Sequence, residues 1–145
     1  MIKTETEYLE AKKRLEQESQ DIELYAEKMK NAGISDDLIH LAIDPLASFK
    51  MQLAEEVEEY EKLKRGYFEP LENFLGIGRT LVSLRISKGL KQKDLASLLG
   101  VKEAQVSRDE RNEYHGASIE KVQKVLEALG VKLTTQIYAY SKKVS

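Results

Sequence analysis

Proline is nearly absent from this sequence, which contains only Pro45 and Pro70 in 145 residues. Proline interrupts helices most strongly, because it lacks a backbone N–H and its ring collides with the preceding turn. Charged residues make up 33% of the chain, and long charged stretches without proline suit helices that have one solvated face. The sequence therefore predicts a mainly α fold.

The N-terminal part is predicted to form an acidic helical hairpin. Thr4 opens a capping-box spacing, and apolar residues then recur at helical spacing as far as Gly33, which signals the end of a first helix. Ser35 is suited to cap a short second helix that ends before Pro45, where a third helix begins and runs to about Arg65. The apolar stripes of the first and third helices predict antiparallel packing.

Four short helices separated by turns are predicted in the second half, over residues 70–88, 92–99, 103–112 and 118–129. The second and third of these have the geometry of a helix-turn-helix, because the chain must reverse within a few residues at Gly100. Val101 and Val106 supply apolar anchors beneath that turn.

One face of the predicted helix 103–112 is small, polar and cationic. Residues separated by one, four, five and eight positions share a helix face, and this spacing brings a set of such side chains together. A face of this kind fits the major groove of DNA and presents donors and acceptors to base edges. Its members are Glu103, Ala104, Ser107, Arg108 and Arg111.

The two halves of the chain carry opposite charge. Residues 1–75 contain 10 basic and 18 acidic residues, a balance of −8, whereas residues 76–145 contain 13 and 7, a balance of +6. A basic half is attracted to the phosphates of DNA, and an acidic half is repelled by them. The charge changes where the helical pattern also changes, which favours a functional division over a chance difference between two solvated surfaces.

Several separated elements of the second half resemble the Cro/CI, or XRE, family of phage-repressor-like helix-turn-helix domains. They occur together at the family's spacings, so the resemblance is specific, although it covers under half of the chain. It implies a lambda-repressor-like helix-turn-helix fold that binds DNA. The matching elements are Leu84-Arg85, Gly89 to Ala96, Leu99-Gly100-Val101, Val106-Ser107-Arg108 with Glu110, and Ala128 to Val131.

The resemblance implies roles for the matching positions. Gln92 would form a hydrogen bond to a DNA phosphate, and its side chain would also act as a cap directed toward the recognition helix. Arg85 and Glu110 would form an ion pair between the first helix of the domain and the recognition helix. If this pair is buried, removal of one partner should lower the stability of the protein by roughly 3–5 kcal/mol, and if it is exposed, the loss should be small. The residues that would face bases are Glu103, Ala104, Ser107 and Arg108.

Two lysines stand where the family usually has a small hydroxyl cap. Lysine is a poor N-cap and its charge lies at the wrong end of the helix dipole. We therefore interpret Lys91 and Lys102 as charges placed beside DNA phosphates with some loss of helix stability. Asn112 completes the predicted DNA-binding set. Glu103 either accepts a hydrogen bond from a cytosine amine or repels the phosphate backbone of DNA, and both possibilities stay open.

The N-terminal half has a looser resemblance to HigA-type antitoxins, carried by the opening Ile2 to Tyr8 and by the helical region before the DNA-binding part. It implies an acidic helical module that binds a basic ribonuclease toxin. An ordinary coiled-coil dimer element explains the same apolar stripe, so both interpretations stay open. Tyr114 and His115 also leave two possibilities, contact with phosphate or packing within their loop.

Residues 131–140 change from helical to alternating periodicity and are rich in β-branched and aromatic residues, which predicts a short C-terminal β-strand. A lone strand needs a partner, so pairing with the same strand of a second subunit is favoured over a frayed tail. The predicted divisions are 1–66 (dimerisation or partner binding), 67–131 (helix-turn-helix domain) and 132–145 (strand and tail).

Other chemistry is not indicated. The absence of cysteine excludes disulfides, thiolate zinc sites and cysteine nucleophiles. His40 and His115 lack metal-ligand spacing, and the carboxylates lie on solvated faces, so we expect no enzymatic activity, metal or cofactor. The polar N-terminus is unlike a signal peptide and no apolar run reaches membrane-spanning length, which predicts a cytoplasmic protein.

Together these patterns predict a homodimeric transcriptional regulator, in the first instance a repressor, that reads a palindromic double-stranded operator with recognition helices about 34 Å apart. One alternative is a HigA-like antitoxin that neutralises a toxin through its N-terminal half and represses its own operon. Another is a helical protein-interaction adaptor that does not bind DNA.

Overall fold

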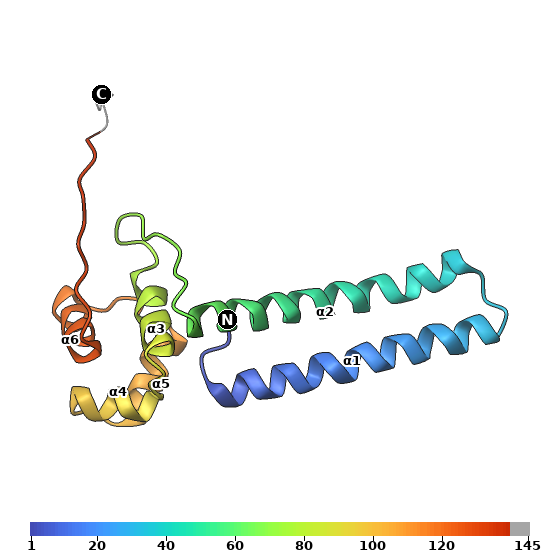
Figure 1. The fold of residues 1–145 in the computed structure, drawn as a ribbon, viewed down its shortest axis with the longest axis horizontal. Coiled ribbons are helices and arrows are strands. Elements are labelled where there is room, and N and C mark those ends of the chain that lie inside the picture. The colour runs from blue at the N-terminus through green and yellow to red at the C-terminus, as the bar shows by residue number, and fades with distance from the viewer. Residues whose placement is uncertain (140–145) are drawn as a thin grey trace.

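The computed structural model describes residues 1–139 and contains a long helical hairpin joined to a cluster of four short helices (Figure 1). The hairpin projects from one side of the cluster, and its free end lies far from the short helices. The helices are α1 (Glu5–Asn31), α2 (Asp36–Lys64), α3 (Ile77–Ser87), α4 (Gln92–Leu99), α5 (Glu103–Arg111) and α6 (Ile119–Leu129). The mainly α prediction and the hairpin are therefore confirmed.

Helix α1 begins and ends as its sequence predicts. Thr4 and Glu7 form a reciprocal capping box, because the Thr4 hydroxyl accepts from the Glu7 N–H and the Glu7 carboxylate accepts from the Thr4 N–H, both at 3.2 Å. The helix ends at Asn31, and Gly33 adopts a left-handed φ of 78° that starts the turn into α2.

The prediction of two helices separated at Pro45 is wrong, because α2 is one helix that continues through this residue. Pro45 and Leu41, whose carbonyl would normally accept the missing N–H, are both exposed. Helix α2 packs along α1 on both sides of the proline, and Pro45 borders the groove between the two helices. Continuous packing against α1 therefore outweighs one lost helical hydrogen bond.

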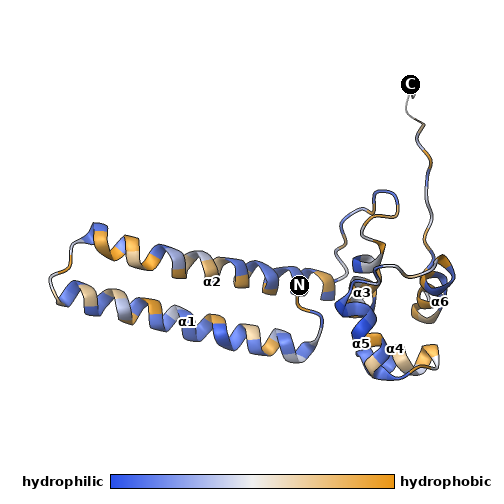
Figure 2. Cartoon of the chain, turned by 180° about the vertical axis from the view of Figure 1, so that it is seen from behind, coloured by the Kyte–Doolittle hydropathy of each residue, from blue (hydrophilic) through white to orange (hydrophobic). Residues whose placement is uncertain are grey.

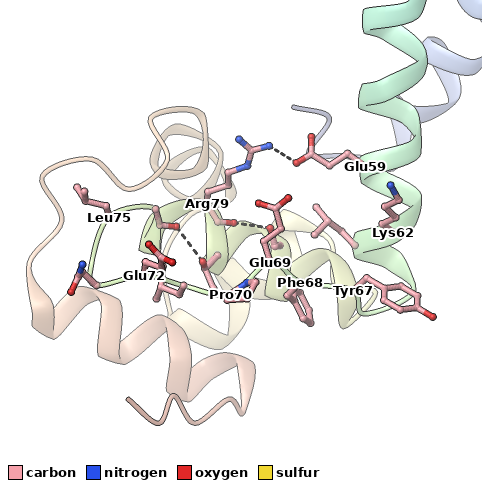
Figure 3. A pocket seen from close by; sticks show the side chains of 15 residues that line it. Glu59, Lys62, Tyr67, Phe68, Glu69, Pro70, Glu72, Leu75 and Arg79 are labelled. Carbon is pink, nitrogen blue, oxygen red and sulfur yellow. Dashed lines mark hydrogen bonds and ion pairs between the residues drawn. The ribbon is translucent and has the colours of Figure 1, made fainter. Parts of the chain in front are cut away.

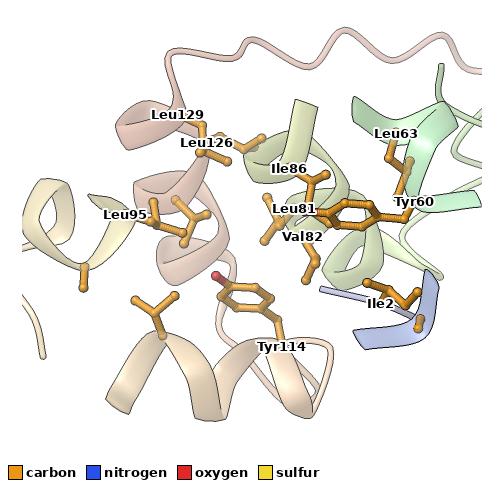
Figure 4. Close-up of a cluster of buried hydrophobic side chains, with 14 of the residues drawn as sticks. Ile2, Tyr60, Leu63, Leu81, Val82, Ile86, Leu95, Tyr114, Leu126 and Leu129 are labelled. Carbon is orange, nitrogen blue, oxygen red and sulfur yellow. The ribbon is translucent and has the colours of Figure 1, made fainter. Parts of the chain in front are cut away.

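The hydrophobic core lies where the hairpin meets the helical cluster (Figure 4). Leu81 and Val82 of α3 are completely buried, and Tyr60 near the end of α2 packs among them. Ile2, which precedes α1, enters the same cluster. The remaining labelled members are Leu63, Ile86, Leu95, Tyr114, Leu126 and Leu129. The base of the hairpin and the helical cluster thus share one core.

The predicted helix over residues 70–88 is shorter than expected, since α3 begins only at Ile77. Gly76 precedes it with a φ of 82°, and Asn73 has a φ of 57°, so the chain at 67–76 forms a loop. This loop borders a pocket of about 610 Å³ between the end of α2 and the start of α3, beside the Arg79–Glu59 ion pair (Figure 3). The left-handed conformation of Gly76 ends the loop, so the helix starts only at the next residue.

The predicted C-terminal strand is also wrong. Residues 131–139 run as an extended tail, and the regular elements of the described chain are all helices. Ile137 is 94% exposed. Tyr140, the last residue of the prediction, lies outside the described residues. Alternating periodicity alone makes no strand, because the backbone groups of a strand need a neighbouring strand to pair with.

Candidate nucleic-acid interface

Helices α4 and α5 pack together around a tight turn at Gly100. Gly100 has a left-handed φ of 67°, and the Val101 N–H returns to the Ala96 carbonyl at 3.0 Å, which closes the end of α4. Leu95 of α4 and Val106 of α5 are buried and fix the two helices on the core. The outer face of α5 is therefore held on a rigid support.

The predicted recognition face of α5 is open to solvent. Glu103, Ala104, Arg108 and Arg111 are exposed and Ser107 is half-buried. Within residues 1–139, Arg108 and Arg111 take part in no ion pair. Lys91, Lys102 and Asn112, at the ends of α4 and α5, are exposed as well. The cationic side chains of this predicted set are therefore accessible to a ligand.

A buried ion pair holds the inner side of α5. The Arg85 side chain is 3% exposed and that of Glu110 is fully buried. Arg85 Nη2 donates to Glu110 Oε2 at 2.8 Å, Nε donates to Oε1, and Nη1 donates to the Leu90 carbonyl at 2.7 Å. A bidentate pair with these additional bonds satisfies both buried charges and fixes the angle of α5 against α3.

Gln92 takes part in this buried network. Its Nε2 donates to Glu110 Oε2 at 2.8 Å, and the residue is half-buried. In this structure the amide of Gln92 therefore joins the first turn of α4 to α5, where the resemblance implied a phosphate contact as well as a cap toward α5.

The helices α4 and α5 begin without a side-chain cap from Lys91 or Lys102. The Asp94 carboxylate accepts from the Lys91 N–H at 2.8 Å, which is half of a capping box. At the start of α5, Lys102 has extended backbone and an exposed side chain. Both helices therefore present a lysine and free backbone N–H groups at their N-termini, an arrangement that favours anions.

In the loop after α5, Tyr114 and His115 lie in different environments, although the sequence allowed either phosphate contact or loop packing for both. Tyr114 is buried in the core, and burial raises the pKa of its phenol. Glu113 and Tyr114 adopt left-handed φ angles of 49° and 53°, which turn the Tyr114 side chain inward. His115 remains exposed beside the end of α5. Tyr114 thus packs the loop.

Two contacts around α5 were not predicted. Lys121 of α6 pairs with Asp109 at 2.7 Å, and Lys3, before α1, donates from Nζ to the Glu110 carbonyl at 2.6 Å. Each of these two contacts joins residues that are far apart in the sequence or lie on different helices, so a local sequence pattern could not have predicted either one.

The comparisons with known proteins agree with this geometry. Residues 81–136 match a family whose description is Helix-turn-helix. The matched segment runs from the buried middle of α3 through α4, α5 and α6 into the extended tail. No curated protein and no solved structure matches the chain.

Proposed function

We propose that the chain is a DNA-binding repressor of the Cro/CI (XRE) type that inserts α5 into the major groove of a specific operator, because residues 81–136 match a helix-turn-helix family. The observation that carries the proposal is the open face of α5, on which Ser107 and Arg108 are accessible while Arg85 and Glu110 anchor the opposite side. A rigid helix with an exposed polar face meets the requirement for reading base edges.

The contacts divide into two kinds. Arg108 is assigned to a base edge, with guanine the preferred partner of an arginine fork. Lys91 and Lys102 are assigned to phosphates, which position the domain but carry no sequence information. Glu103 lies one turn before Ser107 on the exposed face, where a carboxylate accepts from a cytosine amine or selects against other bases.

A palindromic operator requires two copies of the domain, about 34 Å apart. The hairpin offers a surface on which two copies would associate, because large apolar residues stay exposed toward its free end (Figure 2). Leu38 is 57% and Leu41 74% exposed. Monomeric proteins rarely leave such residues clustered in water, and we propose that this end of the hairpin carries the dimer contact.

The dimer contact is tested by Leu41→Glu, with Ile119→Glu on α6 as the matched control, since Ile119 is 80% exposed on the helical cluster. Analytical ultracentrifugation is expected to give a dimer for the parent and the control and a monomer for Leu41→Glu. A monomeric parent, or equal dissociation of both variants, would contradict the assignment.

A second function, that of an antitoxin, is favoured by the acidity of residues 1–75, whose net charge is −8. A hairpin with acidic flanks and an apolar groove of about 640 Å³ between α1 and α2 suits a basic protein. Copurification from the native cell distinguishes the two, since an antitoxin is expected to bring down one small basic protein in stoichiometric amount.

The main proposal is tested by selecting bound sequences from a random pool of duplexes and measuring affinity for the selected site against salt. The logarithm of affinity is expected to fall linearly with the logarithm of salt, by about 0.9 for each phosphate neutralised. Selection of no common sequence, together with salt-insensitive binding or none, would reject the proposal and support the adaptor alternative.

A further inference from the structure

The segment before α1 is bonded directly to the end of the recognition helix. Lys3 Nζ donates to the carbonyl of Glu110 at 2.6 Å and to that of Arg111 at 3.4 Å. These are carbonyls of the last turn of α5, where the Glu110 carbonyl also accepts from the Glu113 N–H at 3.0 Å. A lysine ammonium there lies at the negative end of the helix dipole, so Lys3 adds a charged donor to the local backbone cap of α5.

The backbone of Lys3 is held at the same time by both halves of the protein. Its carbonyl accepts from Arg85 Nη2 at 2.7 Å, and its N–H donates to Glu7 Oε2 at 2.8 Å. Arg85 in turn binds the carboxylate of Glu110. A continuous set of hydrogen bonds therefore runs from the first turn of α1, through Lys3, to the buried pair and the end of α5.

Neighbouring residues prevent this segment from moving freely. Ile2 is 6% exposed and packs in the shared core near Tyr60 and Val82 (Figure 4). On the other side, the α1 capping box fixes Thr4. The backbone of Lys3 is thus anchored before and after, and the position of its side chain depends on the base of the hairpin.

We propose that Lys3 is a positioning residue for DNA recognition, which fixes the end of α5 that carries Arg108 and Arg111 and couples it to the hairpin. This inference rests on the proposed function of α5. It implies that a partner bound to the hairpin alters operator affinity if it displaces residues 1–4, because the restraint on α5 would then be lost without any change at the DNA-facing side chains.

The test compares Lys3→Met, which keeps the aliphatic chain and removes the donors, with Lys13→Met, an exposed lysine of α1 whose loss changes the charge equally. Lys3→Arg restores a cationic donor. Affinities for the selected operator and for a random duplex are measured at several salt concentrations, and amide hydrogen exchange is followed over residues 107–112.

Lys3→Met is expected to lower the ratio of operator to random affinity by about three- to tenfold, as a lost charge-assisted hydrogen bond would. The salt dependence should stay unchanged, exchange at the end of α5 should accelerate, and Lys3→Arg should recover most of the ratio. Lys13→Met should change neither quantity. An unchanged ratio and unchanged exchange would overturn the proposal.

Equal loss of affinity for both duplexes, with a salt slope lower by about 0.9, would also overturn it, since Lys3 would then be a phosphate contact. If the parent binds no DNA, the proposed function fails, but faster exchange at the end of α5 in Lys3→Met alone still supports the restraint. Should Lys3→Met not fold, Lys3→Leu, which also lacks a side-chain donor, is measured in the same way with the same expectations.

Discussion

Gly78 of α3 lies directly against the backbone carbonyl of Glu113, so that a β-carbon at position 78 would stand 1.7 Å from the Glu113 oxygen. The contact is possible only because glycine has no side chain. It lets the loop after α5 pack against α3, and Glu113 and Tyr114 of this loop adopt left-handed conformations. The C-terminal end of α5 is therefore followed by close backbone packing.

Gly78→Ala is expected to destabilise the protein by about 2–3 kcal/mol in urea unfolding, because a backbone carbonyl must move to admit the methyl group. This outweighs the roughly 1 kcal/mol that alanine would add to the stability of α3. Gly89→Ala is the control, since Gly89 has a φ of 68° but open space around it, and backbone strain there should amount to about 1 kcal/mol. A Gly78→Ala protein at least as stable as its parent would show that the contact is not close.

Arg85→Met is expected to lower the free energy of unfolding by about 3–5 kcal/mol, because it leaves the Glu110 carboxylate buried without a countercharge. The double variant Arg85→Met/Glu110→Leu should lose clearly less than the sum of the single changes. Arg79→Met removes the exposed pair with Glu59 and should change stability by less than about 1 kcal/mol. Additive effects at 85 and 110 would mean that the two charges are independent.

Arg108→Ala is expected to reduce discrimination at one base pair of the operator by about 1–3 kcal/mol, whereas Lys102→Ala should weaken binding to all sequences alike. The measurement is a comparison of operator variants, each changed at one base pair, by fluorescence anisotropy. Lys13→Ala, far along α1, serves as the charge control. An even loss across random DNA in Arg108→Ala would place that residue on the backbone.

Replacing both Lys91 and Lys102 by serine is expected to raise stability by about 0.5–2 kcal/mol in total, because serine hydroxyls accept from the free N–H groups of α4 and α5. DNA affinity should fall at low salt, and its salt dependence should become shallower. Thermal unfolding and anisotropy check the two effects separately. Unchanged binding at low salt would contradict the assignment of these lysines to phosphates.

Stability is expected to fall at alkaline pH through Tyr60. Burial raises the pKa of this phenol from 10.0 to about 12, and its OH donates to Glu5 Oε2 at 3.1 Å. Because the folded pKa is the higher one, the stabilisation is fully present below pH 10.0 and is lost as the pH rises toward about 12, by roughly 2–3 kcal/mol. Tyr60→Phe should remove this part of the pH dependence in urea unfolding. An identical dependence in both proteins would assign it to other groups.

Local signals predicted much of this protein. The capping box at Thr4, the stop at Gly33 and the turn at Gly100 are confirmed, because a cap or a left-handed turn depends on a few neighbouring residues. The helix-turn-helix was identified for the same reason, since its apolar anchors and turn lie within some twenty residues. The spacing of Glu103, Ser107 and Arg108 likewise placed them on one helix face.

The sequence by itself determined most of the helical segments and the polar face of α5, because helix periodicity and capping act over one or two turns. Tertiary packing decided that α2 continues through Pro45, that residues 131–139 form no strand, and that Gly78 and Lys3 meet the end of α5. Each of these depends on whether a distant part of the chain supplies a neighbour. Local spacing carries no information about that, because backbone pairing and close packing are properties of the assembled fold.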